Sequence, residues 1–291
     1  MKYFSEFQFS VDDEQIESLL TEIKSGIAMP PNKEVLNLLF SILDLTSLSE
    51  KDNANNIGKL CEQVNLLDES YPDLPAPAAI CVYPELVMLS RTKINNPLVN
   101  IAAVGGGFPA SQTFLEIKLK EIEMAIETGA EEIDIVLPVG KFLLGLYEEI
   151  FEEINLIKEV MGSHHLKVIL ETGSLTNLTE VRKASFLAMD AGADFIKTST
   201  GKTGIGASPD SFAVMCMAIK EYYEKTGKKV GIKPAGGISD VETALIYYNI
   251  VKNVLGEAWL HPEKFRIGAS RLANAILGMI YDKGEDFKYF G

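Results

Sequence analysis

The sequence has little cysteine, histidine or excess positive charge, and each shortage excludes a class of protein. Its 291 residues contain only three histidines and three cysteines, and Cys61, Cys81 and Cys216 are too far apart for metal-ligand spacing. We therefore expect no disulfide framework, no metal centre and a reducing, cytoplasmic compartment. The net charge of −14 argues against nucleic acid as a partner, because phosphate backbones need a basic face.

Long hydrophobic runs are also missing, so a membrane partner is not expected. No apolar segment approaches the length that a membrane helix needs. The first residues, MKYFSEFQFSVDDEQ, are acidic where a signal peptide has a basic start and an apolar stretch. With 47% hydrophobic residues, the chain still has enough apolar material for a large core.

What the sequence does contain is an alternation of short apolar runs with longer helical patterns. Strand candidates lie at 42–48, 78–84, 98–105, 131–138, 166–172, 195–200, 229–237 and 265–270. Helix signals lie between them: apolar periodicity over 113–128, Ser208 before Pro209, and the spacing of a capping box from Ser239. Eight such units predict an α/β protein, a (β/α)8 TIM barrel. A doubly wound open sheet is the alternative, but it usually has fewer strands, and no GxGxxG follows the first one.

Residues 1–33 fall outside the repeat. They show one amphipathic helix over 12–24 and a linker at Pro30-Pro31. We therefore expect an N-terminal helical extension, residues 1–33, packed on the exterior of a barrel domain, residues 34–291.

Two strand candidates carry a lysine in mid-run and end in a glycine-rich turn. In FIKTSTGK, Lys197 follows Phe195 and Ile196, and GIKPAGG carries Lys233. Loss of water and a second positive charge both favour the neutral, nucleophilic amine. Moving a lysine pKa from 10.4 to about 7 costs on the order of 4 kcal/mol, so Schiff-base chemistry on a carbonyl is the expected use. The structural alternative is a lysine that reaches the strand end beside an ordinary turn.

Strand alternation predicts more charges on the same inner face. Side chains alternate along a strand, so outward-facing isoleucines at 196 and 232 aim both lysines into the barrel. The same parity turns Asp134 inward, and Lys167 and Glu171 share a face of the fifth strand. We expect two carboxylates and up to three lysines at the barrel mouth. A purely structural cluster of paired charges is the alternative.

Glycine-rich turns follow the last three strands and indicate a phosphate site. Backbone N–H groups in such turns and at helix N-termini bind anions, and the last two units of barrels commonly hold phosphate. The candidate phosphate ligands are Gly201, Lys202, Gly236, Gly237, Gly268 and Ser270, with Arg271 beside them.

Together these motifs resemble the class I deoxyribose-phosphate aldolases. The resemblance runs from about residue 43 to 272 through LDLTSL, AAICVYP, EEIDIVLP, LKVILETG, ADFIKTSTGK, GIKPAGGI and RIGAS. ADFIKTSTGK with KPAGG downstream is highly specific to that family. The resemblance implies a lyase that cleaves 2-deoxy-D-ribose 5-phosphate reversibly to D-glyceraldehyde 3-phosphate and acetaldehyde. It also implies that no cofactor is needed and that the enzyme serves deoxyribonucleotide catabolism in the cytoplasm.

The resemblance assigns roles residue by residue. Lys197 is implied to be the Schiff-base lysine, Lys233 the neighbour that lowers its pKa, and Asp134 the carboxylate that handles protons with a bound water. The supporting residues it implies beside the aspartate and the substrate are Lys167, Asp44 and Thr46.

Three features depart from the family pattern. Arg271 follows Ser270 where members often have a second serine, and the loop 105–109 is unusually rich in glycine. Some members use a C-terminal tyrosine, for which Tyr281 and Tyr289 are the candidates. A homodimer would agree with the family, but the sequence points to no interface. Two alternative functions stay open: an aldolase with a different phosphorylated donor or acceptor, and a non-catalytic binder of phosphorylated sugars.

Overall fold

The computed structural model describes residues 1–284 and 287–291, and it confirms the predicted (β/α)8 barrel. The described residues form one sheet of eight parallel strands in the order β7-β6-β5-β4-β3-β2-β1-β8. The strands are β1 (Leu43–Thr46), β2 (Ala79–Val82), β3 (Asn100–Val104), β4 (Glu132–Val136), β5 (His165–Ile169), β6 (Phe195–Lys197), β7 (Gly231–Lys233) and β8 (Ile267–Gly268). Two isolated parallel bridges, Ile232 to Phe265 and Ala235 to Gly268, join β7 to the β8 segment.

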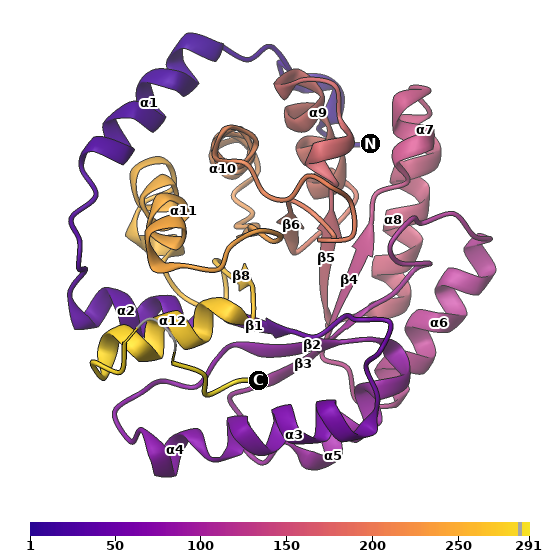
Figure 1. Ribbon diagram of the computed structural model, residues 1–291. Helices are drawn as coiled ribbons and strands as arrows, with labels where there is room; N and C mark the ends of the chain where they lie inside the picture. The colour runs from indigo at the N-terminus through magenta and orange to yellow at the C-terminus, as the bar shows by residue number, and fades with distance from the viewer. Residues whose placement is uncertain (285–286) are drawn as a thin grey trace.

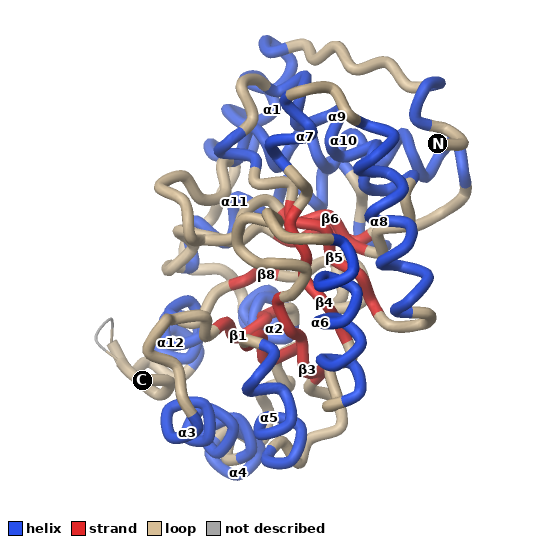
Figure 2. Tube along the Cα trace, turned by 90° about the vertical axis from the view of Figure 1, so that its right-hand side faces the viewer, coloured by secondary structure: helices blue, strands red, loops and turns tan. Residues whose placement is uncertain are grey.

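Helices surround this ring of strands, as Figures 1 and 2 show. They are α1 (Asp13–Ser25), α2 (Lys33–Ser41), α3 (Ala54–Asn65), α4 (Leu67–Ser70), α5 (Val87–Lys93), α6 (Leu115–Glu127), α7 (Val139–Leu143), α8 (Tyr147–Met161), α9 (Leu178–Asp190), α10 (Pro209–Thr226), α11 (Val241–Val254) and α12 (Arg271–Ile280). Short 3-10 turns lie at Phe4–Glu6, Pro84–Leu86, Thr172–Ser174 and Glu257–Trp259. No helix in the described part of the chain is both long and apolar enough to cross a membrane.

Local sequence signals explain where the helices begin. The Ser208 side chain caps α10 by accepting from the backbone N–H of Ser211, and α6 lies within the predicted span 113–128. The expected capping box at Ser239 was wrong. The carboxylate of Asp240 caps α11 instead and accepts from the N–H of Thr243 at 2.8 Å, because Asp240 is the residue directly before the first helical turn.

Strand parity divides the buried side chains into two layers. Outward-facing residues such as Ile196 and Ile232 belong to the large core between strands and helices. A small apolar cluster covers the inner wall at β2 and β3, and its members are Leu48, Ala79, Cys81, Ala102 and Val104. The inward side chains of the other strands include the charged residues described below.

The N-terminal segment lies against the outside of the barrel. Helix α1 contacts α10 and α11 and buries Ile16, Leu20 and Ile23. Before it, the ring of Phe7 stacks on Phe186 with centroids 4.0 Å apart. These contacts cover the outer surface of helices that themselves pack on the strands.

Candidate active site

The structure brings Lys197, Lys233 and Asp134 together inside the barrel. Each side chain projects inward from the end or middle of its strand and is at most 2% exposed. The Nζ atoms of Lys197 and Lys233 lie 2.8 and 2.9 Å from the same oxygen, Oδ2 of Asp134. Two lysines that share one carboxylate oxygen repel each other, which favours deprotonation of one of them.

Two of the supporting residues join this group. Lys167 donates to Oδ1 of Asp134 at 3.1 Å from the neighbouring strand β5. Asp44, on β1, pairs with Lys233 at 2.5 Å. The third, Thr46, donates its hydroxyl to the backbone carbonyl of Asp44 at the end of β1.

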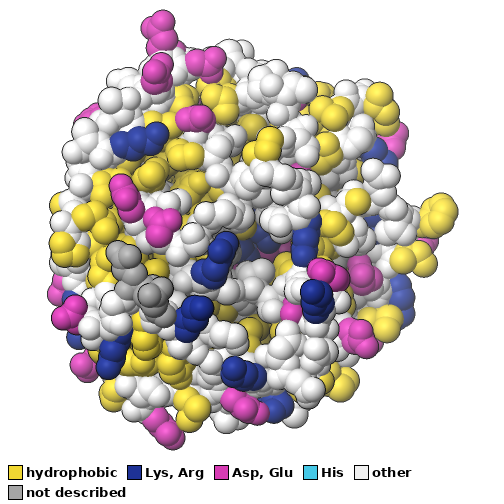
Figure 3. All heavy atoms as spheres, viewed as in Figure 1, with side chains coloured by type: hydrophobic (Ala, Val, Ile, Leu, Met, Phe, Trp, Pro, Cys, Tyr) yellow, Lys and Arg dark blue, Asp and Glu magenta, His cyan; other side chains and the backbone are white. Residues whose placement is uncertain are grey.

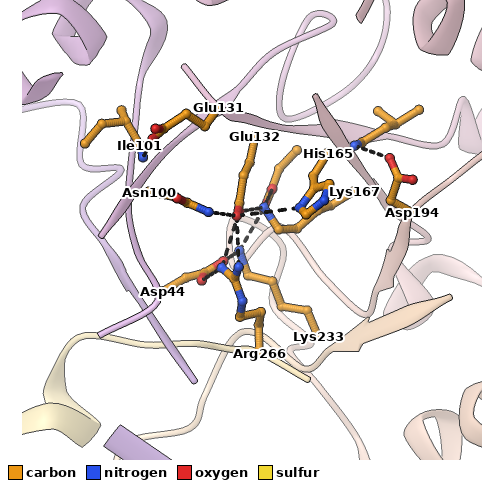
Figure 4. A network of polar contacts seen from close by, with 12 residues as sticks. Asp44, Asn100, Ile101, Glu131, Glu132, His165, Lys167, Asp194, Lys233 and Arg266 are labelled. Carbon is orange, nitrogen blue, oxygen red and sulfur yellow. Dashed lines mark hydrogen bonds and ion pairs between the residues drawn. The ribbon is translucent and has the colours of Figure 1, made fainter. Parts of the chain in front are cut away.

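Three further polar residues complete the cluster, and the sequence reading missed them. Glu132 pairs with Lys167 and accepts from the amide of Asn100 at 2.7 Å, while Arg266 donates to Asp44 and Glu132 (Figure 4). Strand parity could have found Glu132, since it lies two residues before Asp134. Arg266 lies just before β8, outside the extended strand, so strand parity could not have found it.

The predicted place of Glu171 among the lysines was wrong. Strand β5 ends at Ile169, and Glu171 adopts a left-handed backbone with a φ of 53°. Its buried carboxylate accepts from the backbone N–H of Thr200 at 3.2 Å and from the Thr200 hydroxyl at 2.5 Å. The alternation rule failed because it holds only within the extended strand.

The surroundings shift the pKa values of Lys197 and Lys233 in opposite directions. Burial lowers the pKa of Lys197, and the charge of Lys233 lowers it further against the attraction of Asp134. Burial also disfavours the charged form of Lys233, but Asp134 and Asp44 outweigh burial and raise the pKa of that lysine. Burial likewise opposes ionisation of Asp134, yet the surrounding lysines hold its pKa well below the usual range. This arrangement can provide one neutral amine beside an ammonium and a carboxylate.

A cavity of about 480 Å³ opens above Lys197, within the size range of small-molecule sites. All six candidate phosphate residues line it, and so does Arg271: Gly201, Lys202, Gly236, Gly237, Gly268, Ser270 and Arg271. Gly201 and Gly236 have positive φ, and a Cβ at Gly206 would lie 2.4 Å from the carbonyl oxygen of Gly236. The turns after β6 and β7 therefore pack backbone against backbone, which only glycine allows.

Basic side chains gather around the central hollow of the face seen in Figure 3, although the whole chain carries a net charge of −14. In the cavity, Lys202 donates to the backbone carbonyl of Leu48, and the hydroxyl of Ser270 donates to the backbone carbonyl of Thr46. A larger cavity of about 900 Å³ lies between α6, α7 and α8 and is lined by none of the candidate site residues. The local donors, rather than the overall field, suit the smaller cavity to an anion.

The C-terminal tyrosines do not line the cavity above Lys197. The hydroxyl of Tyr289 donates to the carbonyl of Gln63 in α3, and its backbone N–H donates to Asn274 in α12. Tyr281 packs on Tyr71 with ring centroids 4.5 Å apart. Both tyrosines thus contact the outer helices or the segments between them.

Comparison with known proteins gives concordant matches over most of the chain. A family model described as DeoC/LacD family aldolase matches residues 39–256. The chain is 42% identical over 255 residues to the human protein named deoxyribose-phosphate aldolase, which covers 83% of this chain and 79% of that one. It is 39% identical to a putative deoxyribose-phosphate aldolase of Caenorhabditis elegans, over 91% of this chain and 88% of the other. Among solved structures, a putative deoxyribose-phosphate aldolase from Coccidioides immitis has a TM-score of 0.70 at 26% identity, over 92% of this chain and 98% of that one.

Proposed function

The chain belongs to the DeoC/LacD family of aldolases, and on that premise we propose how it cleaves 2-deoxy-D-ribose 5-phosphate to D-glyceraldehyde 3-phosphate and acetaldehyde. The observation that carries the assignment of roles is the sharing of one carboxylate oxygen by two buried lysines below the cavity. This geometry supports a class I mechanism, in which a neutral lysine forms a Schiff base with the carbonyl substrate.

Lys197 is the nucleophile in this proposal. It lines the cavity, and burial and the charge of Lys233 lower its pKa, so a larger share of its amine is neutral. The amine attacks C1 of the open-chain sugar phosphate, and loss of one water gives a protonated imine. Lys233 stays an ammonium, because its two carboxylates raise its pKa.

Asp134 handles the protons. Its pKa is held well below the usual range, so it is ionised and can accept the proton of the C3 hydroxyl, directly or through a water. The C2–C3 bond then breaks, its electron pair forms the C1–C2 double bond of an enamine while the C=N pair moves onto nitrogen, and C3 becomes the aldehyde carbon of glyceraldehyde 3-phosphate. Protonation of the remaining enamine at C2 and hydrolysis of the imine release acetaldehyde and restore the Lys197 amine.

The phosphate is held by the glycine turns in this proposal. Backbone N–H groups of Gly201, Gly236 and Gly237 and the start of α12 after Ser270 supply donors, and Lys202 supplies charge. Arg271, the first residue of α12, stands where members of the family often have a second serine and would add a cation beside the phosphate.

The remaining proposals concern the setting of the enzyme. The three cysteines are free and buried, which fits a reducing cytoplasm, and the substrate fits a role in deoxyribonucleotide catabolism. A homodimer is proposed from the family alone. The acidic chain is not expected to bind nucleic acid.

Trapping of the imine tests this function. The protein is mixed with 2-deoxyribose 5-phosphate, treated with borohydride, digested and mapped by mass spectrometry, with substrate-free protein as the control. We expect a reduced adduct on Lys197. An adduct on Lys233 or Lys167 would keep the aldolase assignment and overturn the role of Lys197. No adduct on folded protein that binds the sugar phosphate would favour the non-catalytic binder, and a panel of aldehydes and sugar phosphates would reveal a different donor or acceptor.

A further inference from the structure

The buried charges inside the barrel form a closed ring of alternating sign. In order around the ring, its members are Asp44, Lys233, Asp134, Lys167, Glu132 and Arg266. Every cation of the ring contacts two of its carboxylates, and every carboxylate contacts two of its cations. Five of the six are labelled in Figure 4, which shows them converging from different strands.

Arg266 closes this ring by joining Asp44 to Glu132. Its guanidinium is 1% exposed, with Nη1 2.7 Å from Oδ1 of Asp44 and Nη2 2.9 Å from Oε1 of Glu132. The Nε–H donates to the carbonyl of Pro262, which fixes the plane of the fork. Arg266 thus links strands β1 and β4, which are not neighbours in the sheet.

Lys197 lies outside the ring. Among the described residues, Asp134 is its only carboxylate partner, and the oxygen that it contacts is already paired with Lys233. Three carboxylates therefore balance three cations before Lys197 is counted. A proton on Lys197 would leave one surplus positive charge in a buried site, which is costly.

We infer that Arg266 is a positioning residue. By closing the ring it pairs with Asp44 and Glu132, whose negative charge would otherwise stabilise the protonated form of Lys197. This inference rests on the proposed role of Lys197 as the nucleophile. Arg266 does not line the cavity above Lys197, and it acts through Asp44 and Glu132.

Three further polar groups face the ring from neighbouring strands. Cys81 faces it from β2, and burial raises the pKa of its thiol to about 11, so the thiol stays neutral. From β5, His165 lies 3.9 Å from Glu132 at the rim of the ring. Asn100, on β3, is neutral and donates to Glu132.

The pH dependence of kcat/KM tests the inference, because its acid limb reports the free-enzyme ionisation of Lys197. Arg266→Met leaves three carboxylates to two ring cations, so Lys197 should keep its proton and the acid limb should move up. We expect a shift of at least about one pH unit, which is a tenfold loss at a pH on the acid side of both limbs that alkaline pH restores. Glu132→Gln removes an anion and should move the limb down.

The double variant Arg266→Met/Glu132→Gln removes one charge of each sign, and its limb should return to within about 0.3 unit of the wild-type position. Arg266→Lys keeps the positive charge but loses the planar guanidinium, and its acid limb should stay at the wild-type pH. Shifts of opposite sign that cancel support the inference. Lower activity without a shift of the limb, or shifts of the same sign, would overturn it. If Arg266→Met does not fold, the predicted downward shift of Glu132→Gln still decides.

The experiment separates this inference from the proposed function. Borohydride trapping is repeated on each variant at its own optimal pH. An adduct on Lys197 without the predicted shifts overturns the role of Arg266 alone. An adduct elsewhere in the wild type overturns the role of Lys197 and with it the inference.

Discussion

Two regions of the molecule bury a lysine to the same degree and give it opposite surroundings. Lys118, between α6 and α8, is 2% exposed and donates to Glu153 at 2.5 Å and to the hydroxyl of Ser111 at 2.7 Å. Lys197 is also 2% exposed, but the carboxylate that it contacts, Asp134, is shared with Lys233 and Lys167. Glu153 also contacts the partly exposed Lys141 at 3.5 Å, whereas Asp134 is shared among three buried lysines.

Burial alone therefore does not mark a reactive lysine. Both lysines lose water on burial, but among the described residues Glu153 contacts one buried cation and Asp134 contacts three. At Lys197 the neighbouring Lys233 takes part of the same carboxylate, and the pKa of Lys197 falls. The charges around each buried lysine, rather than its depth, therefore distinguish the two regions.

The largest effect is expected from Lys197→Leu. It removes the proposed nucleophile and should lower kcat/KM by at least about 10⁴-fold. It also leaves the charge balance of the ring intact, so the free energy of unfolding should change little. Steady-state kinetics and urea denaturation measure the two quantities. Activity within about 100-fold of the wild type would contradict the comparison.

The matched variant Lys118→Leu should show the reverse pattern. Among the described residues, it leaves the buried Glu153 carboxylate paired with the partly exposed Lys141 alone, at 3.5 Å, and should destabilise the fold by about 3 kcal/mol. Since Lys118 lies outside the barrel, kcat/KM per folded molecule should stay within about threefold. Urea denaturation and kinetics at a temperature below unfolding test both parts. A large loss of activity in the folded variant would mean that the two regions are coupled.

The sequence allowed prediction of the features that depend on local patterns. Alternation along each strand correctly turned Lys197, Lys233 and Asp134 inward, since the period of two is a property of the extended chain itself. Closure of the ring could not be predicted, because it depends on how far Arg266 reaches across the barrel to residues 222 and 134 positions away.

Other features depend on three-dimensional packing that no local pattern records. A Cβ at Gly231 would lie 2.3 Å from the ring of Phe195, so this glycine makes room for an aromatic side chain inside the barrel. In the sequence it resembles any other glycine at the start of a strand. Lys118 likewise lies in an ordinary helical pattern, and only the packing of α6 on α8 reveals that it is buried.

A third buried charge sharpens the comparison, because neutral groups satisfy it. Glu171 accepts from the backbone and the hydroxyl of Thr200, next to the proposed phosphate turn. Glu171→Gln keeps the shape of the side chain but weakens these bonds by about 1 kcal/mol, which should raise KM for the phosphorylated substrate about fivefold. Because the effect acts through the turn that we propose to hold the phosphate, kcat/KM for unphosphorylated 2-deoxyribose should not change. An equal loss on both substrates would instead place Glu171 with the residues that control the barrel chemistry.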